Sequence, residues 1–88
     1  MLKIKEDIDL KDLKKFDYYK LDNCDNYQKD LEHAPIPGSW VIRTITKSIY
    51  IKNRVIYYCH DNKQDFATAD NPYIQDIIKS GMIEEVND

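Results

Sequence analysis

WVIRTITKSIYIKNRVIYYC, residues 40–59, is the stretch that decides the fold of this 88-residue chain. It is rich in β-branched and aromatic residues, which favour extended strands. From Ile49 to Lys52 apolar and polar side chains alternate, so that Ile49 and Ile51 face one side and Tyr50 and Lys52 the other. The stretch therefore predicts strands with one buried face and one partly exposed face.

Two short interruptions divide this stretch. Thr46-Lys47-Ser48 predicts a first turn. Asn53-Arg54 predicts either a second turn or a bulge, because asparagine tolerates the left-handed conformation but the glycine that usually follows it is missing. Upstream, the two prolines and the glycine of Ala34 to Ser39 predict a loop.

The N-terminal third predicts a short helix from Asp9 to Phe16. Asp9 can cap its first turn, and leucines recur on one face at helical spacing. Phe16 to Leu31 is ambiguous: Tyr18, Tyr19 and Leu21 indicate the start of a strand, and the turn-rich segment Asp22 to Asn26 interrupts it. Tyr27 to Leu31 reads either as the returning arm of a hairpin or as an irregular edge.

The C-terminal third predicts a polar loop, the best helix of the chain and a short strand. The loop runs from His60 to Asn71, and Asn71-Pro72 then opens the helix, which either Asp70 or Asn71 can cap. Its buried stripe comprises Ile74, Ile77 and Ile78. Gly81 predicts a left-handed cap, and Met82 to Val86 a last short strand.

Together these elements predict one α+β domain over residues 1–88. We expect a small antiparallel sheet of three or four strands, with two helices packed on one face. The other face would be partly exposed and would carry Tyr50 and Lys52.

Charge is distributed unevenly along the chain. The net charge is -3 overall, but residues 33–60 hold no acidic residue and carry a net charge of +4, against -2 before them and -5 after them. An acidic protein has little bulk attraction for nucleic acid or anionic membranes, so only a local patch could act in that way. The centre of the chain is therefore the predicted contact region.

Several kinds of catalytic or ligand site are disfavoured by the residues present. Only Gly38 and Gly81 are available, far apart, so a glycine-rich phosphate loop is excluded. Zinc would have to draw on Cys24, His33, Cys59 and His60, which lack ligand spacing, and the acidic turns lack the calcium-loop pattern. We expect no metal, no cofactor, no catalytic residue and two free thiols, and hence a protein that is not an enzyme.

The basic and aromatic centre is the candidate partner-binding region. Its candidate residues are Arg43, Lys47, Tyr50, Lys52 and Arg54. They could contact an acidic protein surface, or phosphates with tyrosines such as Tyr57 or Tyr58 stacking on bases. The competing interpretation is the solvated face of a hairpin, since cations on exposed strands also protect edges from aggregation.

Neither end suggests export or membrane insertion. The first residues lack the apolar core of a signal peptide, and no stretch approaches the roughly 20 apolar residues of a membrane span. We therefore expect a cytoplasmic protein that does not contact membranes.

Both ends of the chain resemble known proteins. The opening residues 4–16, IKEDIDLKDLKKF, and the closing residues 77–86, IIKSGMIEEV, are similar to the ends of small uncharacterised phage and prophage accessory proteins of low-GC Gram-positive bacteria. In that group a glycine often follows the phenylalanine, whereas Asp17 stands here. The resemblance implies no catalytic residue. It implies a phage-encoded protein that acts in the host cytoplasm, where such proteins bind and block host proteins.

The leading functional hypothesis is a non-enzymatic binding module that inhibits or modulates a host protein. A nucleic-acid-handling defence effector, such as a CRISPR or other anti-phage system, is the expected target, and steric occlusion the expected mechanism. The alternative is nucleic-acid binding through residues 40–58. A homodimer formed through the open sheet is a further alternative.

Overall fold

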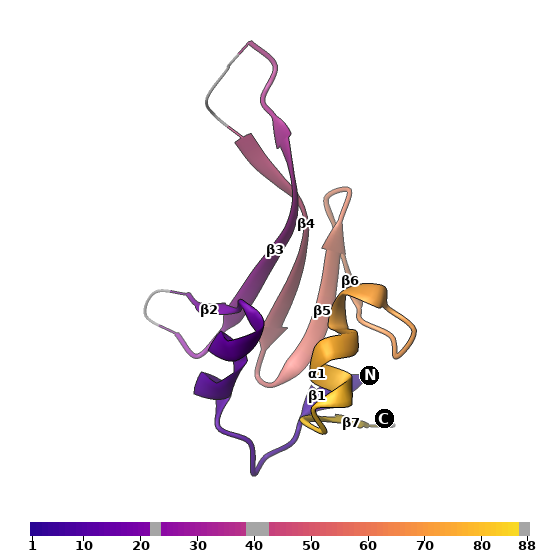
Figure 1. Cartoon of the computed structure of the whole chain (residues 1–88). Coiled ribbons are helices and arrows are strands. Elements are labelled where there is room, and N and C mark those ends of the chain that lie inside the picture. Colours follow the sequence, from indigo (N-terminus) through magenta and orange to yellow (C-terminus); the bar gives the residue numbers. More distant parts are fainter. Residues whose placement is uncertain (22–23, 39–42, 87–88) are drawn as a thin grey trace.

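The computed structural model describes residues 1–21, 24–38 and 43–86. Within them, seven antiparallel strands form one sheet in the order β2-β3-β4-β5-β1-β7, and β6 pairs with β5 beside β1 (Figure 1). The strands are β1 (Leu2–Ile4), β2 (Tyr19–Lys20), β3 (Tyr27–Pro35), β4 (Arg43–Lys52), β5 (Val55–His60), β6 (Lys63–Phe66) and β7 (Ile83–Glu85). The helical segments are η1 (Leu10–Phe16), η2 (Pro72–Ile74) and α1 (Gln75–Lys79).

The predicted α+β fold, with three or four strands and two packed helices, is wrong. The described chain is mostly sheet, and its one α-helix, α1, has 5 residues and continues the 3-10 turn η2. The segment at Leu10–Phe16 is a 3-10 helix. Helices this short depend on packing against the sheet, because isolated turns of helix are unstable in water.

β4 is longer than the sequence indicates, and the turn predicted at Thr46-Lys47-Ser48 is wrong. The strand runs through these residues because β3 pairs with it from Ile51 to Arg43. Ser48 is buried between Asp30 of β3 and Cys59 of β5. Pairing with partners distant in sequence keeps these polar residues extended.

Some predicted segments lie outside the described residues. They are Trp40, Val41 and Ile42, the first residues of the predicted β stretch, and also Ser39 and Asp22-Asn23.

Asn53-Arg54 forms a turn, which resolves the first ambiguity. Both residues have positive φ, 52° and 68°, as a two-residue turn between twisted strands requires. The left-handed conformation is costly for arginine. Its guanidinium group offsets that cost by donating hydrogen bonds to the carbonyl oxygens of Lys5 at 2.7 Å and Ile8 at 2.9 Å.

The predicted polar loop from His60 to Asn71 contains a strand. Asp61 and Asn62 have φ values of 48° and 63° and form a second tight turn, after which β6 returns along β5. The strand sequence, Lys63-Gln64-Asp65-Phe66, is exposed throughout and lacks an apolar pattern. Its strand character comes from pairing with β5, which explains why the sequence alone does not show it.

Other predictions from the sequence are confirmed. Asp9 caps η1 by accepting a hydrogen bond from the Lys11 amide, and Asn71 caps η2 by accepting one from the Tyr73 amide. Gly81 has a φ of 81° after α1, and β7 follows it. The hairpin interpretation of Phe16 to Leu31 is also correct, because β2 pairs with β3. The loop predicted from Ala34 begins two residues later, at Ile36, because β3 extends through Pro35.

One face of the sheet, here the covered face, packs against the helical segments, which lie in front of the sheet in Figure 1. Register places Tyr27, Ile51 and Ile56 side by side on this face. Leu13 of η1, Ile74 of η2 and Ile77 of α1 complete the same core. The three short helical segments thus lie where the sequence predicts two helices.

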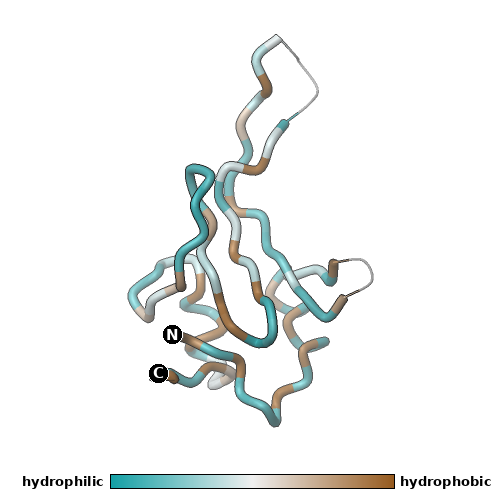
Figure 2. Tube along the Cα trace, turned by 180° about the vertical axis from the view of Figure 1, so that it is seen from behind, coloured by the Kyte–Doolittle hydropathy of each residue, from teal (hydrophilic) through white to brown (hydrophobic). Residues whose placement is uncertain are grey.

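The opposite face, here the open face, is seen in Figure 2. β3 and β4 extend beyond the end of β5 as a two-stranded arm, comprising His33–Pro35 and Arg43–Thr46 (Figures 1 and 2). Shifts in register between Asp30 and His33 mark the start of the arm. Such bulges increase local twist and redirect a strand, which accounts for the way the arm leaves the sheet.

Candidate docking face

Aromatic side chains form a row across the open face. Register aligns Tyr50 of β4 with Tyr57 of β5 and Phe66 of β6, and Gln28 of β3 continues the row to Tyr19 of β2. Directly paired residues of antiparallel strands point to the same face, so this row crosses five strands. We call Tyr19, Tyr50, Tyr57 and Phe66 the aromatic row.

Neighbouring rings of the row touch. The ring centroids of Tyr57 and Phe66 lie 5.4 Å apart in a stacked arrangement, and those of Tyr50 and Tyr57 lie 6.3 Å apart and tilted. Phe66 remains 55% exposed and Tyr19 41% exposed. Large aromatic rings that stay in water are uncommon away from contact surfaces, because burying them is favourable.

Polar groups on the open face orient two of these tyrosines. The Asn26 amide donates a hydrogen bond of 2.8 Å to the Tyr50 hydroxyl oxygen. The Asp30 carboxylate accepts bonds of 2.9 Å from both the Tyr19 hydroxyl and the Gln28 amide. Burial, helped by this bond to Asp30, raises the pKa of Tyr19 to about 12. These bonds orient Tyr19 and Tyr50 before any partner arrives, and they place a carboxylate at the β2–β3 end of the row.

The structure separates the predicted partner-binding residues. Tyr50 and Lys52 share the open face, as alternation requires. Arg43 is exposed near the far end of the arm. Arg54 is fixed by the two backbone carbonyls and approaches the Glu6 carboxylate at 3.4 Å. The four cations therefore do not form one basic patch.

Lys47 belongs to the covered face. Its ammonium group lies 3.4 Å from the Glu32 carboxylate, which also accepts a bond from the Tyr73 hydroxyl. The hydrogen bond to Glu32 raises the pKa of Lys47. Tyr58, the other tyrosine predicted to stack on bases, lies on the same face against His60 and Tyr73. Of the tyrosines named from sequence, Tyr50 and Tyr57 are the two in the row.

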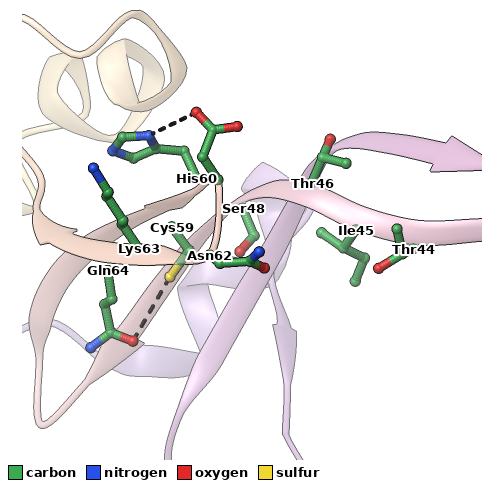
Figure 3. A pocket seen from close by; sticks show the side chains of 10 residues that line it. Thr44, Ile45, Thr46, Ser48, Cys59, His60, Asn62, Lys63 and Gln64 are labelled. Carbon is green, nitrogen blue, oxygen red and sulfur yellow. Dashed lines mark hydrogen bonds and ion pairs between the residues drawn. The ribbon is translucent and has the colours of Figure 1, made fainter.

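A hollow, here the notch, continues the open face where β4 leaves β5. It measures about 520 Å³ and is lined by Thr44, Ile45, Thr46, Ser48 and residues 59–64 (Figure 3). Burial raises the pKa of the Cys59 thiol, whose sulfur lies 3.8 Å from the Gln64 side-chain oxygen. A raised pKa disfavours the thiolate, so Cys59 is a poor nucleophile at neutral pH.

Cys59 and His60 are neighbours in the sequence but do not face each other. The two side chains lie on opposite faces of β5, and the His60 ring instead contacts the Asp65 carboxylate at 2.9 Å. Cys24 and Cys59 are both free thiols. Among residues 1–21, 24–38 and 43–86, no three histidine, cysteine, aspartate or glutamate side chains form a group that could hold a metal ion.

Sequence reasoning missed two members of the row, Tyr19 and Phe66. The sequence predicts a loop at Phe66, although Asp61-Asn62 after a strong strand is a signal for a hairpin turn. Tyr19 lies in a strand of 2 residues, which carries no pattern of its own. Only pairing with Gln28 brings Tyr19 to the open face.

Comparisons of this chain with protein-family models, curated proteins and solved structures found no match. In the part of the chain that the structure describes, no helix is long and apolar enough to cross a membrane.

Proposed function

We propose that this chain is a non-enzymatic protein-binding module that docks through its open face. The observation that supports the proposal best is the aromatic row, which crosses five strands and ends in two exposed rings. Aromatic residues are enriched in protein interfaces, where they bury large areas with little loss of side-chain entropy.

The charges around the row favour a protein partner over nucleic acid. Lys52 is the one candidate cation that shares the row's face, whereas Lys47 and Arg54 are engaged by Glu32 and by backbone carbonyls. Asp30 adds a negative charge at the β2–β3 end of the row. Binding of single-stranded nucleic acid needs a basic groove beside the stacking rings.

The proposed role is inhibition of a host protein by steric occlusion. It is supported by the resemblance of both chain ends to phage and prophage accessory proteins, and the proposed site of action is the host cytoplasm. A nucleic-acid-handling defence effector is the proposed target. The hydrogen bonds of Asn26 to Tyr50 and of Tyr19 to Asp30 suit occlusion, because two of the tyrosines need little ordering on binding.

The first experiment compares the wild-type chain with Tyr57→Ser and Phe66→Ser. Each is immobilised, exposed to a lysate of a low-GC Gram-positive bacterium, and any protein retained is purified and titrated by calorimetry. We expect a retained protein whose affinity for both variants falls at least about tenfold. Lys79→Ser, at an exposed position on α1, is the matched control and should bind like the wild type. A retained protein that binds all four chains equally contradicts the proposal.

Fluorescence anisotropy with labelled DNA and RNA tests the nucleic-acid alternative. We expect no binding at tens of micromolar protein between about 50 and 200 mM salt. Salt-sensitive binding that Lys52→Ala and Tyr57→Ser both weaken would overturn the protein-binding proposal. With Lys52 as the main contact, the slope of the logarithm of the binding constant against the logarithm of the salt concentration would be about -1. Four phosphate contacts would give a much steeper slope.

A further inference from the structure

We propose that the free edge of β4 in the notch, Arg43–Thr46, accepts an extended acidic segment of a protein as an added strand. This inference rests on the proposed function, because it names the kind of partner segment that a protein-binding module of this shape takes. It adds a second contact that the aromatic row does not provide, since backbone pairing and ring burial are separate modes of recognition.

The free edge arises because β4 is longer than β5. Pairing between them ends at Lys47 and His60, whereas β3 continues to pair with β4 as far as Arg43. Within the described residues, the stretch Arg43–Thr46 therefore has a strand on one side alone. Backbone donors and acceptors at such an edge are satisfied by water until another strand pairs with them.

The notch supplies room beside this edge. The β5–β6 hairpin forms its opposite wall, and Figure 3 shows Thr44, Ile45 and Thr46 across the hollow from Asn62, Lys63 and Gln64. Its volume of about 520 Å³ falls within the range of small-ligand sites, about 300–1,000 Å³. Ile45 is 42% exposed there and offers an apolar contact.

The lining favours a peptide over a compact small molecule. One wall is an extended backbone about 13 Å long, at about 3.3 Å per residue, and the other carries polar side chains. An added strand would bond to the first wall through its main chain and place alternate side chains in the hollow.

Charge selects an acidic segment. Arg43 at the end of the edge and Lys63 on the opposite wall are both exposed, and no acidic residue occurs from His33 to His60. Among the lining residues Asp61 carries a negative charge, and its carboxylate lies 3.6 Å from the His60 ring. Acidic side chains on the added strand would pair with Arg43 and Lys63 and set its register.

The test is a selection from a display library of random peptides, each about ten residues long, against the full chain. Selected peptides are made with a free backbone and with one central N-methyl amide, which removes a hydrogen-bond donor. We expect acidic peptides that perturb the amide resonances of Thr44–Thr46, slow their hydrogen exchange and bind at least about tenfold more weakly when N-methylated. A selection that yields no peptide perturbing these amides overturns the inference, as does equal binding of both forms.

Charge reversal provides the second measurement. Arg43→Glu and Lys63→Glu should each weaken the selected peptides at least about tenfold, and more at low salt. Lys79→Glu makes the same charge change at an exposed position on α1 and should leave the affinity unchanged. Equal affinity for all three variants contradicts the inference. Because the hydrogen-exchange pattern of the arm is recorded for each variant, loss of the arm itself would be distinguished from loss of a contact.

The two proposals fail separately. Peptides that bind the notch while no lysate protein depends on the aromatic row would leave the inference standing and remove the proposed function. A lysate protein that depends on Tyr57 and Phe66, with no peptide at Arg43–Thr46, would do the reverse.

Discussion

The two faces of the sheet are built from the same strands and differ in what they hold. On β4, Ile49 and Ile51 are completely buried under the helical segments, while Tyr50 between them lies on the open face and bonds to Asn26. On β5, Ile56 is buried and Tyr57 belongs to the aromatic row. At these positions isoleucines face the core and tyrosines lie on the open face, whereas Tyr58 of β5 lies on the covered face against Tyr73.

This difference separates stability from recognition along one strand. Burial of the isoleucines supplies most of the favourable free energy of folding, which grows with the apolar area removed from water. The row keeps part of its apolar area exposed, so that area is still available for binding. Substitutions on one face should therefore change folding, and those on the other face should change binding.

The largest expected effect is on the covered face. Ile51→Ala should lower the free energy of unfolding by about 3–4 kcal/mol, because a completely buried side chain is replaced by a cavity between Tyr27 and Ile56. Urea denaturation followed by circular dichroism measures this change. Lys52→Ala, one residue away and exposed, should change it by less than about 0.5 kcal/mol. Similar values for the two variants would abolish the distinction between the faces.

The next effect distinguishes two neighbouring cations. Arg54→Met should cost about 2 kcal/mol, because it removes the bonds to the Lys5 and Ile8 carbonyl oxygens that support the left-handed turn. Lys52→Met keeps the turn and should be close to neutral. Thermal denaturation of both variants makes the comparison, and an equal loss would show that Arg54 is not structural.

Adjacent tyrosines should respond with opposite signs. Tyr18 is buried, and among residues 1–21, 24–38 and 43–86 its hydroxyl has no hydrogen-bond partner, so Tyr18→Phe should be neutral or stabilising by up to about 1 kcal/mol. The Tyr19 hydroxyl bonds to Asp30, so Tyr19→Phe should destabilise by about 0.5–1 kcal/mol. Urea midpoints of the two variants test this, and destabilisation by Tyr18→Phe would contradict it.

The same two residues predict how stability changes in alkali. Burial raises the pKa of Tyr18, and the pKa of Tyr19 lies at about 12, both above the ordinary value of 10.0. The unfolded chain therefore loses these protons first, and the stability they contribute is present below pH 10 and falls as pH rises toward the folded pKa values. Stability measured across this range should fall less steeply for Tyr18→Phe than for the wild type.

A small effect on stability is expected at the end of the row. Phe66→Ser should change the free energy of unfolding by less than about 1 kcal/mol, because the ring is 55% exposed. The same variant should lose affinity for the partner in the capture experiment. Loss of folding instead of affinity would assign the row to the core.

The sequence predicts much of the local structure and little of the site. Alternation from Ile49 to Lys52 and the caps at Asp9, Asn71 and Gly81 depend on neighbouring residues, and these predictions are confirmed. The predicted number of strands is wrong, because β6 is a strand through pairing and not through composition, and β2, at the strand start that the tyrosines indicate, is fixed by its pairing with β3. Phe66 entered the row by that same pairing.

The sequence by itself determined which side chains of β4 and β5 alternate, where the short helical segments begin, and that the centre of the chain carries the positive charge. Tertiary structure alone decided that Lys47, Lys52 and Arg54 lie in three different environments. The physical reason is that each environment is made by residues far away in the chain: Glu32 for Lys47, and the carbonyl oxygens of Lys5 and Ile8 for Arg54. Local spacing determines which face a side chain points to, and long-range pairing determines which groups it contacts there.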